Sequence, residues 1–219
     1  MQFKLSTSSI SLMEDCPRCF WLDKHNVWKR PTGIFPSLPN GMDRILKKHF
    51  DNFRDKGKLP PELCATSHCS EMRLFGINEE EKELLRIWRD NRSGIEYEDD
   101  EGNRLMGAVD NVLVKDDKLI VLDYKTRGYP CKEDTHEHYQ KQLDIYNFLL
   151  EKNGFNIEDY GFLLFYVPKE VLETGEVIFD TELIKMKINT EEAEKIFNRA
   201  LKILNGKCPS EVCEWCKGV

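Results

Sequence analysis

The sequence predicts an α/β or α+β core that follows a helix-rich N-terminal arm. Apolar residues recur at helical spacing through most of the first ninety residues, and again over 135–152 and 190–204. Residues 95–125 and 162–188 instead show the shorter period and the β-branched or aromatic content that are typical of strands. The order of helices, three strands, helix, two strands and helix predicts this class of fold.

In the arm, the pattern predicts a helix over 6–26, which Pro17 divides into two pieces. Three prolines in 29–40 predict an extended connector, because proline and the residue before it disfavour helix. After the connector we expect a helix, a loop, a short strand and a second helix, over 41–56, 59–69, 70–77 and 79–89.

The core begins with three predicted strands, from residue 95, over 105–114 and over 119–125. Turns at 99–103 and 115–118 would join them as an antiparallel meander. The remaining elements are an amphipathic helix, two strands and a final helix, which we expect over 135–152, 162–167, 177–188 and 190–204.

Length and composition indicate a soluble protein of ordinary size. Its 219 residues suit one domain over 1–219, with an arm (1–90), a core (91–205) and a tail (206–219). A hydrophobic content of 40% is too high for a disordered chain. Apolar runs are far shorter than the ~20 residues of a membrane span, and the N-terminus lacks a signal-peptide core. We therefore expect a cytoplasmic protein with no membrane contact, whose eight cysteines are thiols or metal ligands.

The net charge of −7 argues against a nonspecific nucleic-acid coat. The charge is uneven, however, because residues 1–60 hold 11 Lys and Arg against 6 Asp and Glu. Aromatic residues are interleaved with these cations, as in single-strand binding sites. The candidate nucleic-acid contacts are Arg18, Lys29, Arg30 and Arg44. The alternative is an amphipathic helix with a solvated basic side and a buried aromatic side.

Two aspartates and a lysine form the candidate catalytic group. A turn at 115–118 would make the strands of Asp110 and Asp123 antiparallel neighbours, so their carboxylates can lie close together. Lys125 is two residues after Asp123 and leaves the same face of the strand. Converging carboxylates repel unless a cation intervenes, and oxygen donors, with the backbone carbonyl of Tyr124 as a third, suit Mg²⁺ or Mn²⁺. The alternative is a structural strand-end Asp110 and a cross-strand ion pair of Asp123 with Lys125.

At these residues the sequence resembles the PD-(D/E)XK nuclease superfamily. Asp110 matches its first acidic position and Asp123-x-Lys125 its (D/E)xK motif, although Val109 replaces the usual proline. The resemblance implies a restriction-endonuclease-like fold, a mixed central β-sheet flanked by helices. It also implies metal-dependent hydrolysis of DNA phosphodiesters, in which Asp110 and Asp123 hold Mg²⁺ or Mn²⁺ and Lys125 assists catalysis.

The helix after this motif is similar to that of the RecB-like branch. Gln142 and Tyr146 are four residues apart, so both side chains share a helix face that can point at the site. The branch also often takes a metal ligand from the histidine of an N-terminal Gly-x-x-x-His pattern, but Ile45 stands at that position here. Asp43 and His49 are the candidate replacements, and an ordinary, partly buried histidine is the alternative for His49.

Cysteines near both ends of the chain form a candidate second metal site. Two Cys-x2-Cys pairs, Cys16 with Cys19 and Cys213 with Cys216, can bind zinc or an iron–sulfur cluster. The tail also resembles that of CRISPR-associated RecB-like exonucleases, some of which hold a [4Fe–4S] cluster with one N-terminal and three C-terminal cysteines. That resemblance implies Cys16, Cys208, Cys213 and Cys216 as ligands, with Cys19 as the substitute if zinc is bound. Buried packing without metal is the alternative.

The resemblance implies DNA as the partner, as single strands or duplex ends, and protein partners in repair, recombination or CRISPR adaptation. A noncatalytic nucleic-acid-binding or assembly factor on the same fold is one alternative, motivated by the absent histidine. A zinc or iron–sulfur protein centred on the terminal cysteines is another. The sequence leaves open exo- or endonuclease action, polarity, and DNA or RNA as substrate.

Overall fold

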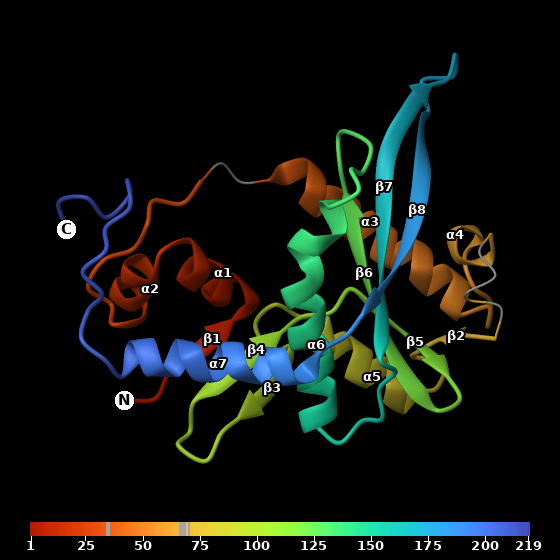
Figure 1. Ribbon diagram of the computed structural model, residues 1–219. Helices are drawn as coiled ribbons and strands as arrows, with labels where there is room; N and C mark the ends of the chain where they lie inside the picture. The colour runs from red at the N-terminus through yellow and green to blue at the C-terminus, as the bar shows by residue number, and fades with distance from the viewer. Residues whose placement is uncertain (34–35, 66–68, 70) are drawn as a thin grey trace.

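Two β-sheets form the framework of the protein in the computed structural model, which describes residues 1–33, 36–65, 69 and 71–219 (Figure 1). The larger sheet has the order β2, β5, β6, β7 and β8, which span Arg73–Leu74, Asn111–Lys115, Lys118–Thr126, Tyr160–Val171 and Val177–Lys187. The smaller sheet has the order β1, β4 and β3, which span Lys4–Ser6, Arg104–Gly107 and Ile95–Glu98. Strands β6 and β7 are parallel and the other neighbours in the larger sheet are antiparallel. The larger sheet is therefore mixed, as the resemblance implies.

Helices cover both faces of the larger sheet (Figure 1). On one face, α6 (Gln140–Lys152) shares a hydrophobic cluster with Val121 of β6. On the other face, α3 (Ser37–Arg54) shares a second cluster with Leu122, the next residue along the strand. Because side chains alternate along a strand, every second residue after Val121 points toward α6.

The N-terminal helices and the C-terminal tail lie together, at the left of Figure 1. The predicted division at Pro17 is confirmed, since α1 (Thr7–Asp15) ends just before it and α2 (Pro17–Lys24) begins with it. Proline is tolerated there because the first turn of a helix leaves its N–H groups unbonded.

Several predicted helices are confirmed with shifted ends. The sequence placed α3 at residue 41, but it begins at Ser37, so the extended connector is shorter than 29–40. Helices α5 (Glu79–Trp88) and α7 (Thr190–Leu204) fall where expected. The helix over 135–152 begins with a 3₁₀ segment, η2 (Thr135–Tyr139), before α6. A short helix, α4 (Pro61–Cys64), lies within the predicted loop, and the strand over 70–77 is reduced to β2.

The single strand predicted over 105–114 is wrong, and with it the three-strand meander. Two strands, β4 and β5, occupy this stretch and belong to different sheets. Between them the Val109 N–H donates to the carbonyl oxygen of Trp88 at 3.1 Å, and Arg89 Nε donates to that of Asp110 at 2.7 Å. These contacts take the backbone out of both ladders, so Asp110 lies in a connector rather than within a strand.

No helix among the described residues is long and apolar enough to cross a membrane.

A substitution at Gly94 tests how closely the turn before β3 packs against the end of β4. Its φ is +58°, a left-handed conformation, and an added Cβ would lie 2.4 Å from the Gly107 carbonyl oxygen. We expect Gly94→Ala to lower the free energy of unfolding by about 2 kcal/mol or more, because a steric clash adds to backbone strain. Urea denaturation measures this loss.

Gly175→Ala is the matched control. Gly175 has φ +86° but nothing within 4 Å of an added Cβ, so it should lose only about 1 kcal/mol. Equal losses in the two variants would contradict the close approach of Gly94 to Gly107.

Candidate active site and metal centre

The two predicted carboxylates meet where the pairing of β5 with β6 ends. Asn111 of β5 and Leu122 of β6 are the last residues that pair in register. Asp110 and Asp123 are the next residues on the two segments and therefore lie opposite each other. The side chain of Asp110 reaches β6, where its Oδ2 accepts a hydrogen bond from the Tyr124 N–H at 3.0 Å. The structure thus brings the two aspartates together beside the β6 backbone.

The negative charge of Asp110 affects the pKa of the Asp123 carboxyl. Asp123 is buried, with 2% of its surface exposed. Burial, and then the negative charge of Asp110, raises the pKa of the Asp123 carboxyl to about 7 against the opposing charge of Lys125. Two carboxylates held this way favour a cation between them.

Lys125 connects β6 to α6. Its Nζ lies 2.5 Å from Oδ2 of Asp123 and donates a hydrogen bond to Oε1 of Gln142 at 2.9 Å. Gln142 Nε2 in turn donates to the hydroxyl of Tyr146 at 2.6 Å. The ammonium also lies 4.7 Å from the ring centroid of Tyr139. All five predicted catalytic residues therefore belong to one connected group.

A carboxylate and an amine from α3 join the group from the other face of the sheet. Lys47 Nζ lies 2.9 Å from both carboxylate oxygens of Asp43 and 3.0 Å from Oδ1 of Asp110. Burial, and then the charge of Asp110, raises the pKa of the Asp43 carboxyl, which the neighbouring Lys47 opposes. Of the two replacements that the sequence offered for the family's histidine, Asp43 is therefore at the site.

His49 contacts a different partner. Its Nε2 lies 3.0 Å from Oε1 of Glu62, whose same oxygen accepts a hydrogen bond from the hydroxyl of Tyr166 at 2.8 Å. Ile45, at the position of the family's histidine, is 59% exposed. The structure therefore brings neither residue into the aspartate group.

Two arginines and an aspartate support the connector that carries Asp110. Arg89 donates to the Asp110 carbonyl oxygen and, through Nη1, to Oδ1 of Asp51 at 2.8 Å. Arg54 pairs with Asp51 as well, and its Nη2 donates to Oδ1 of Asn111 at 2.6 Å. Buried charges that are paired and hydrogen-bonded fix geometry well. This network holds the backbone on both sides of the Asp110 side chain.

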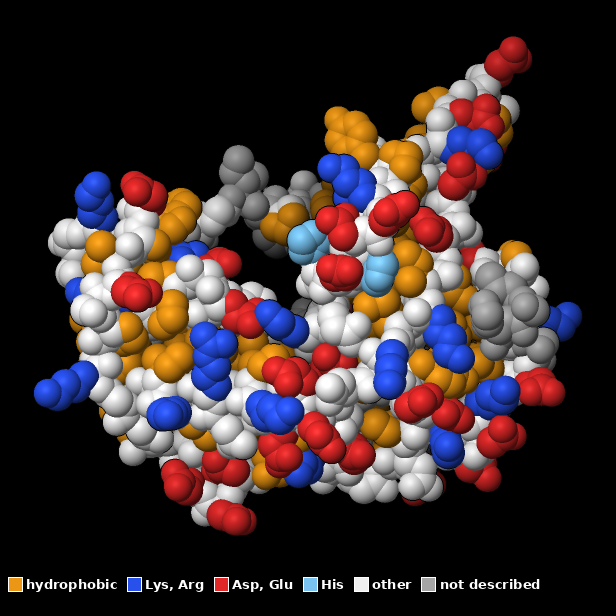
Figure 2. Space-filling view, in the orientation of Figure 1, with side chains coloured by type: hydrophobic (Ala, Val, Ile, Leu, Met, Phe, Trp, Pro, Cys, Tyr) orange, Lys and Arg blue, Asp and Glu red, His pale blue; other side chains and the backbone are white. Residues whose placement is uncertain are grey.

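A cavity of about 560 Å³ opens beside the group, between α1 and the segment of η2 and α6. The α1 side carries the hydroxyls of Thr7, Ser8 and Ser11 and the carboxylates of Glu14 and Asp15, and the other side carries Glu137, Lys141 and Gln142. Figure 2 shows a hollow in the surface between the α1–α2 side and the η2–α6 side. Gln142 belongs both to the cavity lining and to the aspartate group, so the two adjoin at this residue.

The residues present fit a divalent metal ion. Oδ2 of Asp123 is buried beside the carboxylate of Asp110, and the Lys125 ammonium lies 2.5 Å from it. Neighbouring carboxylates with hard oxygen donors suit Mg²⁺ or Mn²⁺.

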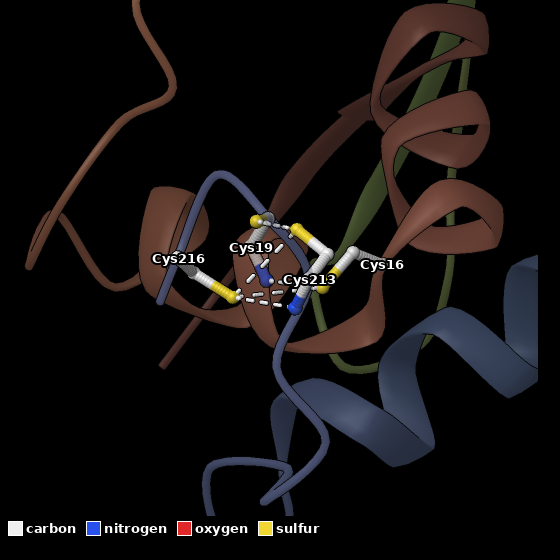
Figure 3. A group of neighbouring side chains, drawn as sticks. All are labelled: Cys16, Cys19, Cys213 and Cys216. Atoms are coloured by element: carbon white, nitrogen blue, oxygen red, sulfur yellow. Dashed lines mark hydrogen bonds between the residues drawn. The ribbon is translucent and has the colours of Figure 1, made fainter. Parts of the chain in front are cut away.

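Four cysteines from the two ends of the chain converge in a second group (Figure 3). The Sγ atoms of Cys16, Cys19, Cys213 and Cys216 all lie within 4.8 Å of one another. The separations are 3.9 Å for Cys16–Cys216, 3.5 Å for Cys19–Cys213 and 3.8 Å for Cys213–Cys216. Tetrathiolate groups of this kind bind metal.

Cys19 takes the place that the resemblance implied for Cys208. Cys16 caps α2, and its Sγ accepts the Cys19 N–H at 3.4 Å, while Cys216 Sγ accepts the Cys213 N–H at 3.3 Å. Each Cys-x2-Cys turn thus directs two sulfurs to one point. Cys208 lies next to the group and accepts a hydrogen bond from Arg18 at 3.4 Å instead.

Two of the four predicted nucleic-acid contacts are engaged within the protein. Arg18 donates to two carbonyl oxygens of the C-terminal tail at 2.6 and 3.0 Å, and Arg30 donates to the carboxylate of Asp15 at 3.2 Å. Lys29 and Arg44 are exposed, and Nζ of Lys29 lies 3.9 Å from Oδ1 of Asp23. The positive charge of the arm therefore serves partly to hold the tail.

Sequence reasoning missed Lys47 as a site residue, and it missed the network of Asp51, Arg54 and Arg89. The four-residue spacing between Asp43 and Lys47 is a signal for the first, since it puts both on one helix face. The network joins residues up to 57 positions apart, and no local pattern indicates it.

A model of the PD-(D/E)XK nuclease superfamily matches residues 4–218. A search of curated proteins finds no match.

Gly107 tests how closely β4 and α6 must approach to hold Tyr146 in place. An added Cβ would lie 2.7 Å from two carbons of the Tyr146 ring and 3.1 Å from Cδ1 of Leu149. We expect Gly107→Ala to destabilise the fold by about 1–3 kcal/mol, because the buried ring must move. Urea denaturation measures the loss, and it should shrink in a Tyr146→Ala background, where the methyl group has room. Additive losses would contradict the contact.

Proposed function

Because the chain belongs to the PD-(D/E)XK nuclease superfamily, we propose that it hydrolyses phosphodiester bonds of DNA with the help of Mg²⁺ or Mn²⁺. The observation that carries the proposal is the meeting of Asp110, Asp123 and Lys125 at the end of the β5–β6 pairing. Membership of the superfamily makes the chain a nuclease in general terms. The DNA substrate, the metal and the residue roles below are our proposal.

Asp110, Asp123 and Asp43 would hold the metal ion. The backbone carbonyl of Tyr124 is a further candidate ligand, because the N–H and C=O of one strand residue point to the same edge and the Tyr124 N–H faces Asp110. When bound, a divalent ion polarises the phosphodiester and lowers the pKa of an attacking water. The raised pKa values of Asp43 and Asp123 agree with this role, since a site built for a cation leaves its carboxylates in mutual repulsion.

Lys125 would assist catalysis. Its ammonium is held by Asp123 and Gln142, so the charge stays beside the carboxylates that would bind the metal ion. From there it can orient the attacking water or neutralise the charge that develops on the phosphoryl oxygens. Gln142 and Tyr146 are positioning residues, because they act through Lys125 and Tyr146 fills the space against Gly107.

The cavity beside Gln142 is the proposed path of the DNA strand. Its hydroxyls suit sugar–phosphate contacts, while Lys141 is paired with Glu14 and three carboxylates also line the cavity. The exposed Lys29 and Arg44 are candidates for contacts farther out. The pairing of Gln142 with Tyr146 supports a place in the RecB-like branch. That branch suggests action at DNA ends, in repair, recombination or CRISPR adaptation, with protein partners to match.

We also propose that the four-cysteine group binds zinc rather than a [4Fe–4S] cluster. Ligand sulfurs of one tetrahedral zinc ion, at Zn–S distances of about 2.3 Å, lie about 3.8 Å apart. The three separations of 3.5–3.9 Å match that spacing. A four-iron cluster would hold its ligand sulfurs farther apart, because four metal atoms stand between them.

Removing the Lys125 amine should abolish cleavage while the protein stays folded. We expect Lys125→Ala to lower the Mn²⁺-dependent rate on labelled linear DNA by at least about 100-fold, because the developing charge loses its partner. EDTA should stop the wild-type reaction. Labelled circular DNA in the same assay shows whether cleavage needs an end.

Lys118→Ala is the matched control, since Lys118 is an exposed lysine of the same strand that pairs with Glu158. It should cleave as the wild type does. Wild-type cleavage by purified Lys125→Ala protein would refute the assigned site. DNA binding without cleavage by the wild type would favour the noncatalytic alternative.

Metal analysis tests the cysteine group. We expect about one zinc ion per chain, and no absorbance of an iron–sulfur cluster after anaerobic purification. A Cys213→Ser/Cys216→Ser variant should lose the zinc and unfold at lower temperature, because metal binding contributes to folding. Cys208→Ser should keep the zinc. Loss of metal in Cys208→Ser, or iron in place of zinc, would contradict this assignment.

A further inference from the structure

We infer that Lys47 is an internal cation that occupies the place of the metal ion between Asp43 and Asp110, so that a divalent ion must displace its amine to bind. This inference rests on the proposed function, because it assumes that these carboxylates hold a metal. It adds a competitor to the proposed site and concerns the metal affinity of the protein without DNA.

The contacts of Lys47 place its charge centrally between the two carboxylates. Its Nζ is 2.9 Å from both oxygens of Asp43 and 3.0 Å from Oδ1 of Asp110. Its side chain is 22% exposed and that of Asp110 is 17% exposed, so the pair is only partly screened by water. The Lys47 ammonium thus neutralises these two carboxylates, as a bound metal ion would.

The amine and a metal ion bridging the same oxygens exclude each other. A metal ion binds carboxylate oxygens at about 2.0–2.2 Å for Mg²⁺ and for ions of similar size. Because Nζ of Lys47 contacts oxygens of both Asp43 and Asp110, an ion that bound to both carboxylates would have to compete with the amine for these oxygens. Lys125 contacts a different proposed ligand, because its Nζ lies beside Oδ2 of Asp123 and Oε1 of Gln142 on the α6 side.

Anchoring of α3 does not require this contact. Leu46 and Phe50 of α3 are buried in the cluster beneath the sheet, with 6% and 0% of their surfaces exposed. Arg54, near the end of the helix, is fixed by Asn111 and by the carbonyl of Phe75. The helix is thus held on both sides of Lys47, and the amine is free to serve the charge balance of the site.

The charge count shows what the amine achieves. Three carboxylates, of Asp43, Asp110 and Asp123, face two ammonium groups, of Lys47 and Lys125. Without Lys47 the α3 side of the site would hold two carboxylates with no counter-charge, which attract a divalent ion strongly. Lys47 therefore lowers the affinity of the protein for free metal.

Calorimetric titration of the zinc-containing protein with Mn²⁺, without DNA, tests the inference. We expect Lys47→Gln to bind Mn²⁺ about tenfold more tightly than wild type, because a unit charge about 3 Å from the ligand oxygens is removed. Lys47→Arg keeps the charge and should bind as wild type does. Lys48→Gln is the matched control, since it removes the same charge from the next, exposed residue and should leave the affinity unchanged.

The outcomes separate this inference from the proposed function. Equal or weaker Mn²⁺ binding by Lys47→Gln would overturn the inference and leave the metal site standing, as would the same gain in Lys48→Gln. Mn²⁺ binding that Asp110→Asn does not weaken would overturn both. Unfolding curves of the zinc-containing variants, recorded without Mn²⁺, verify that each is folded.

Discussion

The site depends on one constraint, the end of the hydrogen-bonded pairing between β5 and β6 just before Asp110 and Asp123. Beyond Asn111 and Leu122 the two segments no longer pair. The Tyr124 N–H, which would continue the ladder, donates a hydrogen bond to the Asp110 carboxylate instead. A backbone donor of the sheet thereby orients the side chain of Asp110. Burial, and then the negative charge of Asp110, raises the pKa of the Asp123 carboxyl. A bound cation would relieve the repulsion between the two carboxylates.

The two lysine amines and the cysteine group have different roles in the structure: the first concerns the charge of the site and the second the position of the arm. Lys125 and Lys47 balance the carboxylates from opposite faces of the sheet, because they come from β6 and α3. The cysteine group instead joins the beginning of α2 to the C-terminal tail, about 200 residues away along the chain. A metal ion bound by these cysteines would restrict the unfolded chain across this long loop and stabilise the arm that forms one wall of the cavity.

Much of this could be predicted from the sequence, because the signals are local. Apolar periodicity located α5, α6 and α7, and short motifs located Asp110, Asp123, Lys125 and the Gln142–Tyr146 pair. The rest depends on tertiary contacts. The sequence does not show the break between β4 and β5, because residues 105–114 are largely apolar. Strand β1 forms only because it pairs with β4, some 100 residues later. The spacing of the two Cys-x2-Cys pairs indicated the four cysteines that converge, whereas the resemblance implied Cys208 in place of Cys19.

The central claim is that Asp110 and Asp123 share one divalent ion. Anomalous scattering from crystals soaked in Mn²⁺ tests it most directly, because it locates the ion without reference to activity. The account predicts a manganese peak in contact with carboxylate oxygens of both residues, with the Lys47 amine moved away from Asp110. Crystals whose manganese lies elsewhere, or contacts one of the two aspartates without the other, would contradict it.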